Sequence, residues 1–170
     1  MPKIRSLRAY DVHVDLLDSA VKLACSDSGG TPPTQADLRR ALSTAYYAAF
    51  HFVMAQCADL LTCDPGGQTI GRAWHQVYRS VKHVDVRNAC NVAADASYGF
   101  PKEIQEFAVL YPNMRRLREE ADYDPALREF KPLHVMAKIS DVDFAIQRFS
   151  QVEELHRRAF AILVAVRRYS

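Results

Sequence analysis

Apolar residues recur every three or four positions through most of the 170-residue chain, and no segment shows the two-residue alternation typical of a strand. The second apolar segment is hydrophobic almost all round, which is typical of a helix at the centre of a bundle. Short connections between segments favour antiparallel neighbours. The sequence therefore predicts an all-α fold, a single up-and-down bundle of five or six helices. The pattern places these helices at about 11–26, 35–61, 69–89, 101–123, 132–149 and 153–168.

Turn-forming residues refine the helix ends. We expect Thr34 to be the N-cap of the second helix, with Asp37 favouring its positively polarised first turn. Pro101 fits the first turn of the fourth helix. Pro112 lies inside that helix and should kink or divide it, because proline removes a backbone hydrogen bond and clashes with the preceding turn. The segment 91–99 fits no single element.

The same periodicity predicts which residues face the core. Stripes are expected on five of the helices. In chain order they are Val12, Leu16, Ala20 and Leu23; Leu42, Tyr46, Ala49, Val53, Cys57 and Leu60; Trp74, Val77, Tyr78, Val81 and Val84; Val135, Ile139, Val142, Ile146 and Phe149; and Leu155, Ala159, Ile162, Leu163 and Val166.

Composition narrows the class of protein. Hydrophobic residues make up 49% of the chain and charged residues 25%, which excludes a disordered or collagen-like chain. We expect one domain over 1–170. The net charge of +2 argues against a protein that coats nucleic acid through bulk charge, but a local Arg/His phosphate site is compatible with it. The apolar run from Ala159 to Val166 is too short to span a bilayer, and the four cysteines form no C-x-x-C pair. These features predict a cytoplasmic protein with reduced thiols and no membrane contact.

The predicted third helix carries a stripe of basic and imidazole side chains. His75, Arg79, His83 and Arg87 follow one another at intervals of four residues, so one continuous helix would align them. Guanidinium groups bind phosphate and imidazole exchanges protons near neutral pH, so the stripe suits a phosphodiester-cleaving site. The alternative is a solvated helix face. His75 and His83 would lie about 12 Å apart along the axis, too far to share an ion, and we expect no metal and no cofactor.

A second polar series lies on the second helix. Ser43, Tyr47 and His51 are spaced by four residues inside an otherwise apolar stretch. A half-buried histidine beside a tyrosine suits a general base. The alternative is a core histidine whose ring nitrogens are satisfied by neighbouring groups.

The fourth helix ends with a charged segment. Arg118 and Asp122 are one turn apart, and Tyr123 follows immediately. The two charges could form an ordinary surface ion pair. Their position at a helix end that a proline terminates also suits a structural clamp.

Two of these segments resemble one family. The run S-T-A-Y-Y-A-A-F-H over 43–51 resembles the S-x-A-Y-Y-A-x-F-H segment of HEPN-domain proteins, and R-E-E-A-D-Y-D-P over 118–125 resembles their R-x-x-A-D-Y segment. The order and spacing of the two segments also fit, and the resemblance covers roughly 35–150. It is closest to an uncharacterised HEPN-like branch with the A-D-Y-D-P ending.

The resemblance implies a helical bundle, often a homodimer, and one of two functions. Many members are metal-independent ribonucleases of toxin or phage-defence systems, in which Arg and His of an R-x4–6-H motif meet at a dimer cleft. Others are non-catalytic modules that bind a protein or nucleotide, such as an antitoxin or a minimal nucleotidyltransferase. Here three residues separate Arg79 from His83, one fewer than the shortest form of that motif.

The first hypothesis is an RNA-cleaving or RNA-binding protein. Arg79 would hold the phosphate and His83 would act as acid or base on the ribose 2′-hydroxyl or the leaving oxygen, with no metal. The candidate catalytic residues are Arg79, His83 and His51. A larger set is expected to bind RNA or line the cleft: His75, Arg87, Tyr47, Arg118, Asp122 and Tyr123. The second hypothesis is a non-enzymatic module in which the Tyr47/His51 and Arg118/Asp122/Tyr123 groups form a buried network that fixes helix register.

Overall fold

The computed structural model describes residues 12–25, 30–63, 71–124 and 129–166. These ranges contain seven α-helices, a short 3-10 helix and no β-strand, which confirms the all-α prediction. None of the described helices has an apolar stretch long enough to cross a lipid bilayer. The helix residues predicted at 11, 26, 69–70 and 167–168 lie outside the described ranges. The helices are α1 (Val12–Ala24), α2 (Gln35–Thr62), α3 (Gly71–Ser80), α4 (His83–Ala93), α5 (Lys102–Tyr123), α6 (Pro132–Ser150) and α7 (Glu154–Ala165), with 3-10 helix η1 (Ala96–Tyr98).

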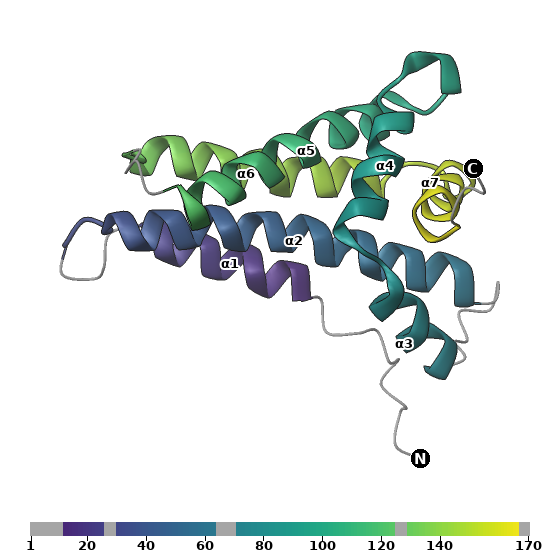
Figure 1. The fold of residues 1–170 in the computed structure, drawn as a ribbon, viewed down its shortest axis with the longest axis horizontal. Helices are drawn as coiled ribbons and strands as arrows, with labels where there is room; N and C mark the ends of the chain where they lie inside the picture. Colours follow the sequence, from purple (N-terminus) through teal and green to yellow (C-terminus); the bar gives the residue numbers. More distant parts are fainter. Residues whose placement is uncertain (1–11, 26–29, 64–70, 125–128, 167–170) are drawn as a thin grey trace.

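The long helix α2 is the centre of the bundle. Within the described ranges it packs against every other α-helix. Figure 1 shows α1 along one side of α2, α5 and α6 along the other, and α3, α4 and α7 near its C-terminal end. Its buried residues lie on all sides of the helix, as the sequence predicts. Because α2 contacts all the others, side chains on its different faces meet different helices.

The start of α2 is fixed by a capping box. Thr34 Oγ1 accepts a hydrogen bond from the Asp37 backbone N–H at 3.2 Å, and the Asp37 carboxylate accepts one from the Thr34 N–H at 2.9 Å. The Thr34 hydroxyl also donates to the Asp37 carboxylate at 2.6 Å, and this hydrogen bond, together with the one from the Thr34 backbone N–H, holds the pKa of Asp37 below its usual value. The N-cap predicted at Thr34 is confirmed, and two backbone donors of the first turn are satisfied.

The predicted third helix is wrong, because the chain breaks it into two. α3 ends at Ser80, and α4 begins at His83 after an extended Lys82 with φ −113° and ψ 152°. The break lets Trp74 of α3 pack against α2 while Val86 of α4 is buried in the main core. It also resets the helical phase, so Val84, predicted to be inward, is 41% exposed.

The segment 91–102 joins α4 to α5 without a strand. α4 continues to Ala93, η1 follows, and Gly99 then adopts φ +73°, a left-handed conformation that residues with a Cβ rarely take. Pro101 is the N-cap of α5 rather than its first residue. Pro112 does not divide α5, because the buried Ala108, Tyr111 and Met114 around it hold both halves against the core.

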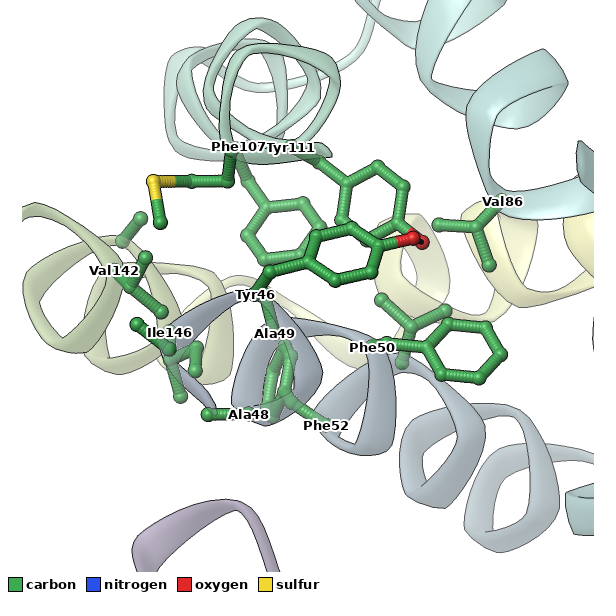
Figure 2. Packing of buried hydrophobic residues seen from close by; sticks show 14 of the residues in the cluster. Tyr46, Ala48, Ala49, Phe50, Phe52, Val86, Phe107, Tyr111, Val142 and Ile146 are labelled. Carbon is green, nitrogen blue, oxygen red and sulfur yellow. Dashed lines mark hydrogen bonds between the residues drawn. The ribbon is translucent and has the colours of Figure 1, made fainter. Parts of the chain in front are cut away.

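Aromatic rings fill the middle of the bundle. Phe107 of α5 contacts the rings of Phe52, Tyr111, Phe149 and Phe160, with centroid separations of 5.2–6.4 Å. Figure 2 shows Phe107 and Tyr111 beside Tyr46 of α2. The stripes predicted on α2 and α6 are buried, except for the half-buried Leu60. This rigid core supports the polar side chains that lie at its edge.

The prediction of which residues of α7 face the core is wrong. Leu155, Ile162 and Val166 are 72%, 45% and 60% exposed, whereas Phe160 and Val164 are buried. The second half of α7 is apolar on every side, so periodicity cannot determine which face turns inward. Phe160 decides it, because its ring packs against Phe107 and Phe149.

Candidate functional site

A polar series on α2 reaches across to α5. Ser43 Oγ donates a hydrogen bond to Asp122 Oδ2 at 3.3 Å, and the Tyr47 hydroxyl accepts one from the Arg118 guanidinium at 3.0 Å. Arg118 Nε lies 2.7 Å from Asp122 Oδ2, an ion pair too far off the N–H direction to be a linear hydrogen bond. The two sequence segments that carry the family resemblance are therefore in direct contact.

Aromatic rings hold the Arg118 guanidinium. Its Cζ lies 5.5 Å from the centroid of the Tyr47 ring and 5.2 Å from that of Tyr123, both within cation–π range. The Arg118 side chain is 21% exposed, and Tyr123 is 70% exposed. The guanidinium is therefore fixed in position at the molecular surface.

His83 joins this site from the start of α4. Its Nδ1 lies 2.7 Å from the Tyr46 hydroxyl, which is 3.0 Å from the Tyr111 hydroxyl. The ring stacks on Phe50 at 3.8 Å between centroids and meets Tyr47 edge-on at 6.0 Å. Figure 2 shows the hydroxyl groups of Tyr46 and Tyr111 close together beside Val86. We call Tyr46, Tyr47, His83, Arg115 and Arg118 the His83–Arg118 cluster.

The electrostatics of the cluster keep His83 neutral. Burial lowers the pKa of His83 below the ordinary histidine value of about 6.5, and the positive charges of Arg118 and Arg115 lower it further. Burial raises the pKa of the Tyr46 and Tyr111 hydroxyls, so both stay protonated. The cluster thus combines a neutral imidazole with two guanidinium groups, which together can bind an anion and exchange or donate a proton.

His51 forms a separate pair with α3. Its Nδ1 lies 2.6 Å from the Tyr78 hydroxyl, and burial lowers the pKa of His51, with a smaller contribution from the charge of His13. Tyr78 stacks on Trp74, whose Nε1 donates a hydrogen bond to Asp59 at 2.7 Å. This arrangement matches the alternative in which His51 is satisfied by a neighbour. That neighbour is Tyr78 and not Tyr47.

The basic stripe predicted on one helix does not form. His75 and Arg79 belong to α3, whereas His83 and Arg87 belong to α4, and the break at 81–82 separates their faces. His75, Arg79 and Arg87 are exposed. The side chain of Arg79 forms no hydrogen bond or ion pair with a described residue. The cations that act on His83 are Arg118 and Arg115, from α5.

The sequence did not predict that three residues contribute polar groups to the site. Tyr46 was assigned only to the core stripe, and Tyr111 and Arg115 were not singled out. Tyr46 lies in the S-T-A-Y-Y segment, which could have drawn attention to it, but the chain holds no comparable signal for Tyr111. In the described ranges, no three His, Cys, Asp or Glu side chains lie close enough together to hold a metal ion.

Comparisons with other proteins leave the family open. The chain matches no protein-family model, and neither a curated protein nor a solved structure matches it at a significant level. The HEPN resemblance therefore stands on the two sequence segments alone.

Proposed function

We propose that this chain is a HEPN-like, RNA-directed protein in which the His83–Arg118 cluster engages a phosphodiester. The observation that carries the proposal is the meeting of a neutral, half-buried His83 with the positive charges of Arg118 and Arg115. Guanidinium groups stabilise charge that develops on a phosphate, and a neighbouring imidazole can act on the attacking or leaving oxygen. The reaction class is metal-independent RNA cleavage, as the family resemblance implies.

Contact between the two family-like segments supports this assignment. Tyr47 and Ser43 lie in one segment, Arg118 and Asp122 in the other, and two hydrogen bonds join them. In this proposal Arg118 replaces Arg79 as the partner of His83. Arg79 and His75 lie on the exposed side of α3, which carries no acidic residue in its first turn.

The test is cleavage of a mixed-sequence RNA in EDTA by the full chain. We expect His83→Asn to lose about a hundredfold or more of the rate, because the catalytic nitrogen is removed. Asparagine keeps an acceptor near the Nδ1 position for the Tyr46 hydroxyl, so the fold should survive. The matched control is His75→Ala, an exposed histidine outside the cluster, which should cleave like wild type.

Arg79→Ala separates this proposal from the arginine–histidine pair predicted on one helix. Retained cleavage in Arg79→Ala with loss in Arg118→Ala would support Arg118 as the phosphate-binding residue. Equal cleavage by wild type and His83→Asn would refute a catalytic cluster.

A non-catalytic HEPN module is the second candidate, and one observation favours it. The Arg118 guanidinium already has Asp122, Tyr47 and Tyr123 as internal partners, which suits a group that fixes helix register. Such a module would bind a protein or nucleotide, for example an antitoxin or a nucleotidyltransferase. Its signature is RNA or partner binding without cleavage. The homodimer that the resemblance implies is tested by the mass in solution.

A further inference from the structure

Three polar groups form a chain that runs from the core to the surface. The Tyr111 hydroxyl contacts the Tyr46 hydroxyl at 3.0 Å, and the Tyr46 hydroxyl contacts His83 Nδ1 at 2.7 Å. Tyr111 is 0% exposed, Tyr46 is 2% exposed, and His83 is half-buried. Within the described residues, Tyr46 is the only hydrogen-bond partner of the Tyr111 hydroxyl. Tyr111 is therefore the innermost residue of this series of hydrogen bonds, which ends at its hydroxyl.

Because the series of hydrogen bonds ends at Tyr111, only one direction leaves no hydroxyl hydrogen unpaired. If Tyr111 donates to Tyr46 and Tyr46 donates to His83 Nδ1, both hydroxyl hydrogens have an acceptor. In the opposite direction, His83 Nδ1–H donates to Tyr46, Tyr46 donates to Tyr111, and the Tyr111 hydrogen is left without an acceptor in the core. Burying an unpaired polar hydrogen is unfavourable, so the first direction is the stable one.

We infer that Tyr46, supported by Tyr111, is a positioning residue that holds His83 in the tautomer with the proton on Nε2. The Nδ1 lone pair is then occupied, and Nε2–H is the ring group left for a ligand. No described residue forms a hydrogen bond with Nε2.

The groups around His83 act in the same direction. From α5, the positive charges of Arg118 and Arg115 lower the pKa of His83, and from α2, His51 lowers it to a smaller extent. The other facing groups are the Phe50 ring and the protonated Tyr46 and Tyr47 on α2. Protonation at Nδ1 would reverse the hydrogen-bond chain as well as add a charge beside two guanidinium groups.

The tautomer changes the role open to His83. A neutral imidazole that presents N–H donates a hydrogen bond to a phosphate oxygen and stabilises charge there, but it has no free lone pair to accept a proton. His83 then serves as an electrophilic donor rather than as the base on the 2′-hydroxyl. This consequence rests on the proposed function, whereas the tautomer itself rests only on the hydrogen bonds of the free protein.

The experiment is a multiple-bond 1H–15N spectrum of the 15N-labelled full chain without RNA, recorded above the His83 titration midpoint. The expected result is one His83 species with the proton on Nε2. A proton on Nδ1 would overturn the inference, as would an equal mixture. His51, paired with a tyrosine that has no second hydroxyl partner among the described residues, is the internal comparison. If the wild-type chain shows this His83 spectrum but does not cleave RNA, the result counts against the proposed function and leaves the tautomer inference standing.

Paired variants test the positioning role. Tyr46→Phe/Tyr111→Phe removes both hydroxyls, leaves no unpaired hydroxyl in the core, and should give a mixture of His83 tautomers with a higher titration midpoint. Tyr111→Phe keeps the Tyr46 donor and should keep the single Nε2–H form. A single Nε2–H form with the wild-type midpoint in the double variant would show that Tyr46 does not set the tautomer. If the double variant fails to fold, the wild-type and Tyr111→Phe spectra still decide the direction.

Discussion

His83 is neutral at pH 7 because several neighbours act on it in the same direction. Its ring is half-buried against Phe50, and the charges of Arg118 and Arg115 oppose a further positive charge. His51 is also neutral, and burial is the largest cause of the lowered pKa of both histidines, but among the described residues the only charge that adds to it at His51 is that of His13. The two imidazoles differ in what surrounds them: only His83 is beside arginine side chains that can hold an anion.

Both histidines make stability depend on pH. The pKa of each is lower in the folded chain than the ordinary histidine value of about 6.5, so the unfolded chain binds more protons below that pH. Stability is fully present above about pH 6.5 and falls as the pH drops through the lower, folded-state pKa values. We expect the melting temperature to decrease as the pH falls below about 6.5, and His51→Asn/His83→Asn to flatten this decrease. A wild-type melting temperature constant below that pH would contradict the assignment.

Asp122 of α5 accepts a hydrogen bond from Ser43 of α2 and forms an ion pair with Arg118 on its own helix, and Arg118 in turn donates to Tyr47 of α2. The Asp122 side chain is 26% exposed. Asp122→Ala removes its hydrogen bond with Ser43 and its ion pair with Arg118, and leaves Arg118 with only its tyrosine contacts. We expect a loss of about 1–2 kcal/mol in the free energy of unfolding by urea. The matched control is Glu119→Ala, which breaks the exposed Arg115–Glu119 pair on the same helix and should cost about 0.5 kcal/mol. Equal losses would mean that Asp122 is an ordinary surface charge.

At the scale of elements, α3 is the least firmly attached helix near the site. Among the described elements it packs mainly against α2, and Trp74 is its one buried residue. The Trp74–Asp59 and Tyr78–His51 hydrogen bonds supply the specific contacts. Local opening of α3 should therefore need less free energy than unfolding of the whole bundle.

Hydrogen exchange can detect this local opening. Trp74→Phe keeps most of the buried ring but removes the hydrogen bond to Asp59. We expect faster amide exchange across 71–80, with exchange in α2 and α5 unchanged. The exposed Arg79→Ala serves as the control and should leave the pattern as in wild type. If Trp74→Phe speeds exchange in all helices alike, α3 is part of one cooperative unit.

The helices could be predicted where local rules determine them. Thr34 and Asp37 mark the start of α2, and Pro132 marks the start of α6 at its first residue. The break at 81–82 could not be predicted, because the apolar spacing continues through it and only tertiary packing separates Trp74 from Val86. The face of α7 was equally ambiguous, because its apolar residues surround the helix.

The site shows the same division. The α2 and α5 segments were recognised from their residues, and the structure brings them together. Their link to His83 through Tyr46 depends on where α4 begins, which no local pattern indicates. A continuous third helix predicted Arg79 as the partner of His83. The break puts the two residues on different helices, and in our proposal Arg118, whose charge acts on His83, takes that role.

At the scale of the molecule, one aromatic core holds the site in position. Phe107 is 0% exposed and contacts rings from three other helices, α2, α6 and α7, as well as the ring of Tyr111 on its own helix. Phe107→Ala should cost about 3–5 kcal/mol in urea unfolding, because it leaves a cavity. Phe144, 60% exposed on α6, offers the same substitution outside the core, and Phe144→Ala should change the stability by less than about 1 kcal/mol. Similar losses of stability in the two variants would mean that Phe107 is not at the centre of the hydrophobic core.

The most direct test of the central claim is a titration of the 15N-labelled chain with a short, non-cleavable RNA while the histidine ring signals are recorded. The account predicts that the His83 ring signals move with RNA concentration, since the phosphate binds beside His83 and Arg118. Signals of His134, exposed on the first turn of α6, should stay in place. Binding that moves His134 and leaves His83 unchanged, or no binding at all, would contradict the account.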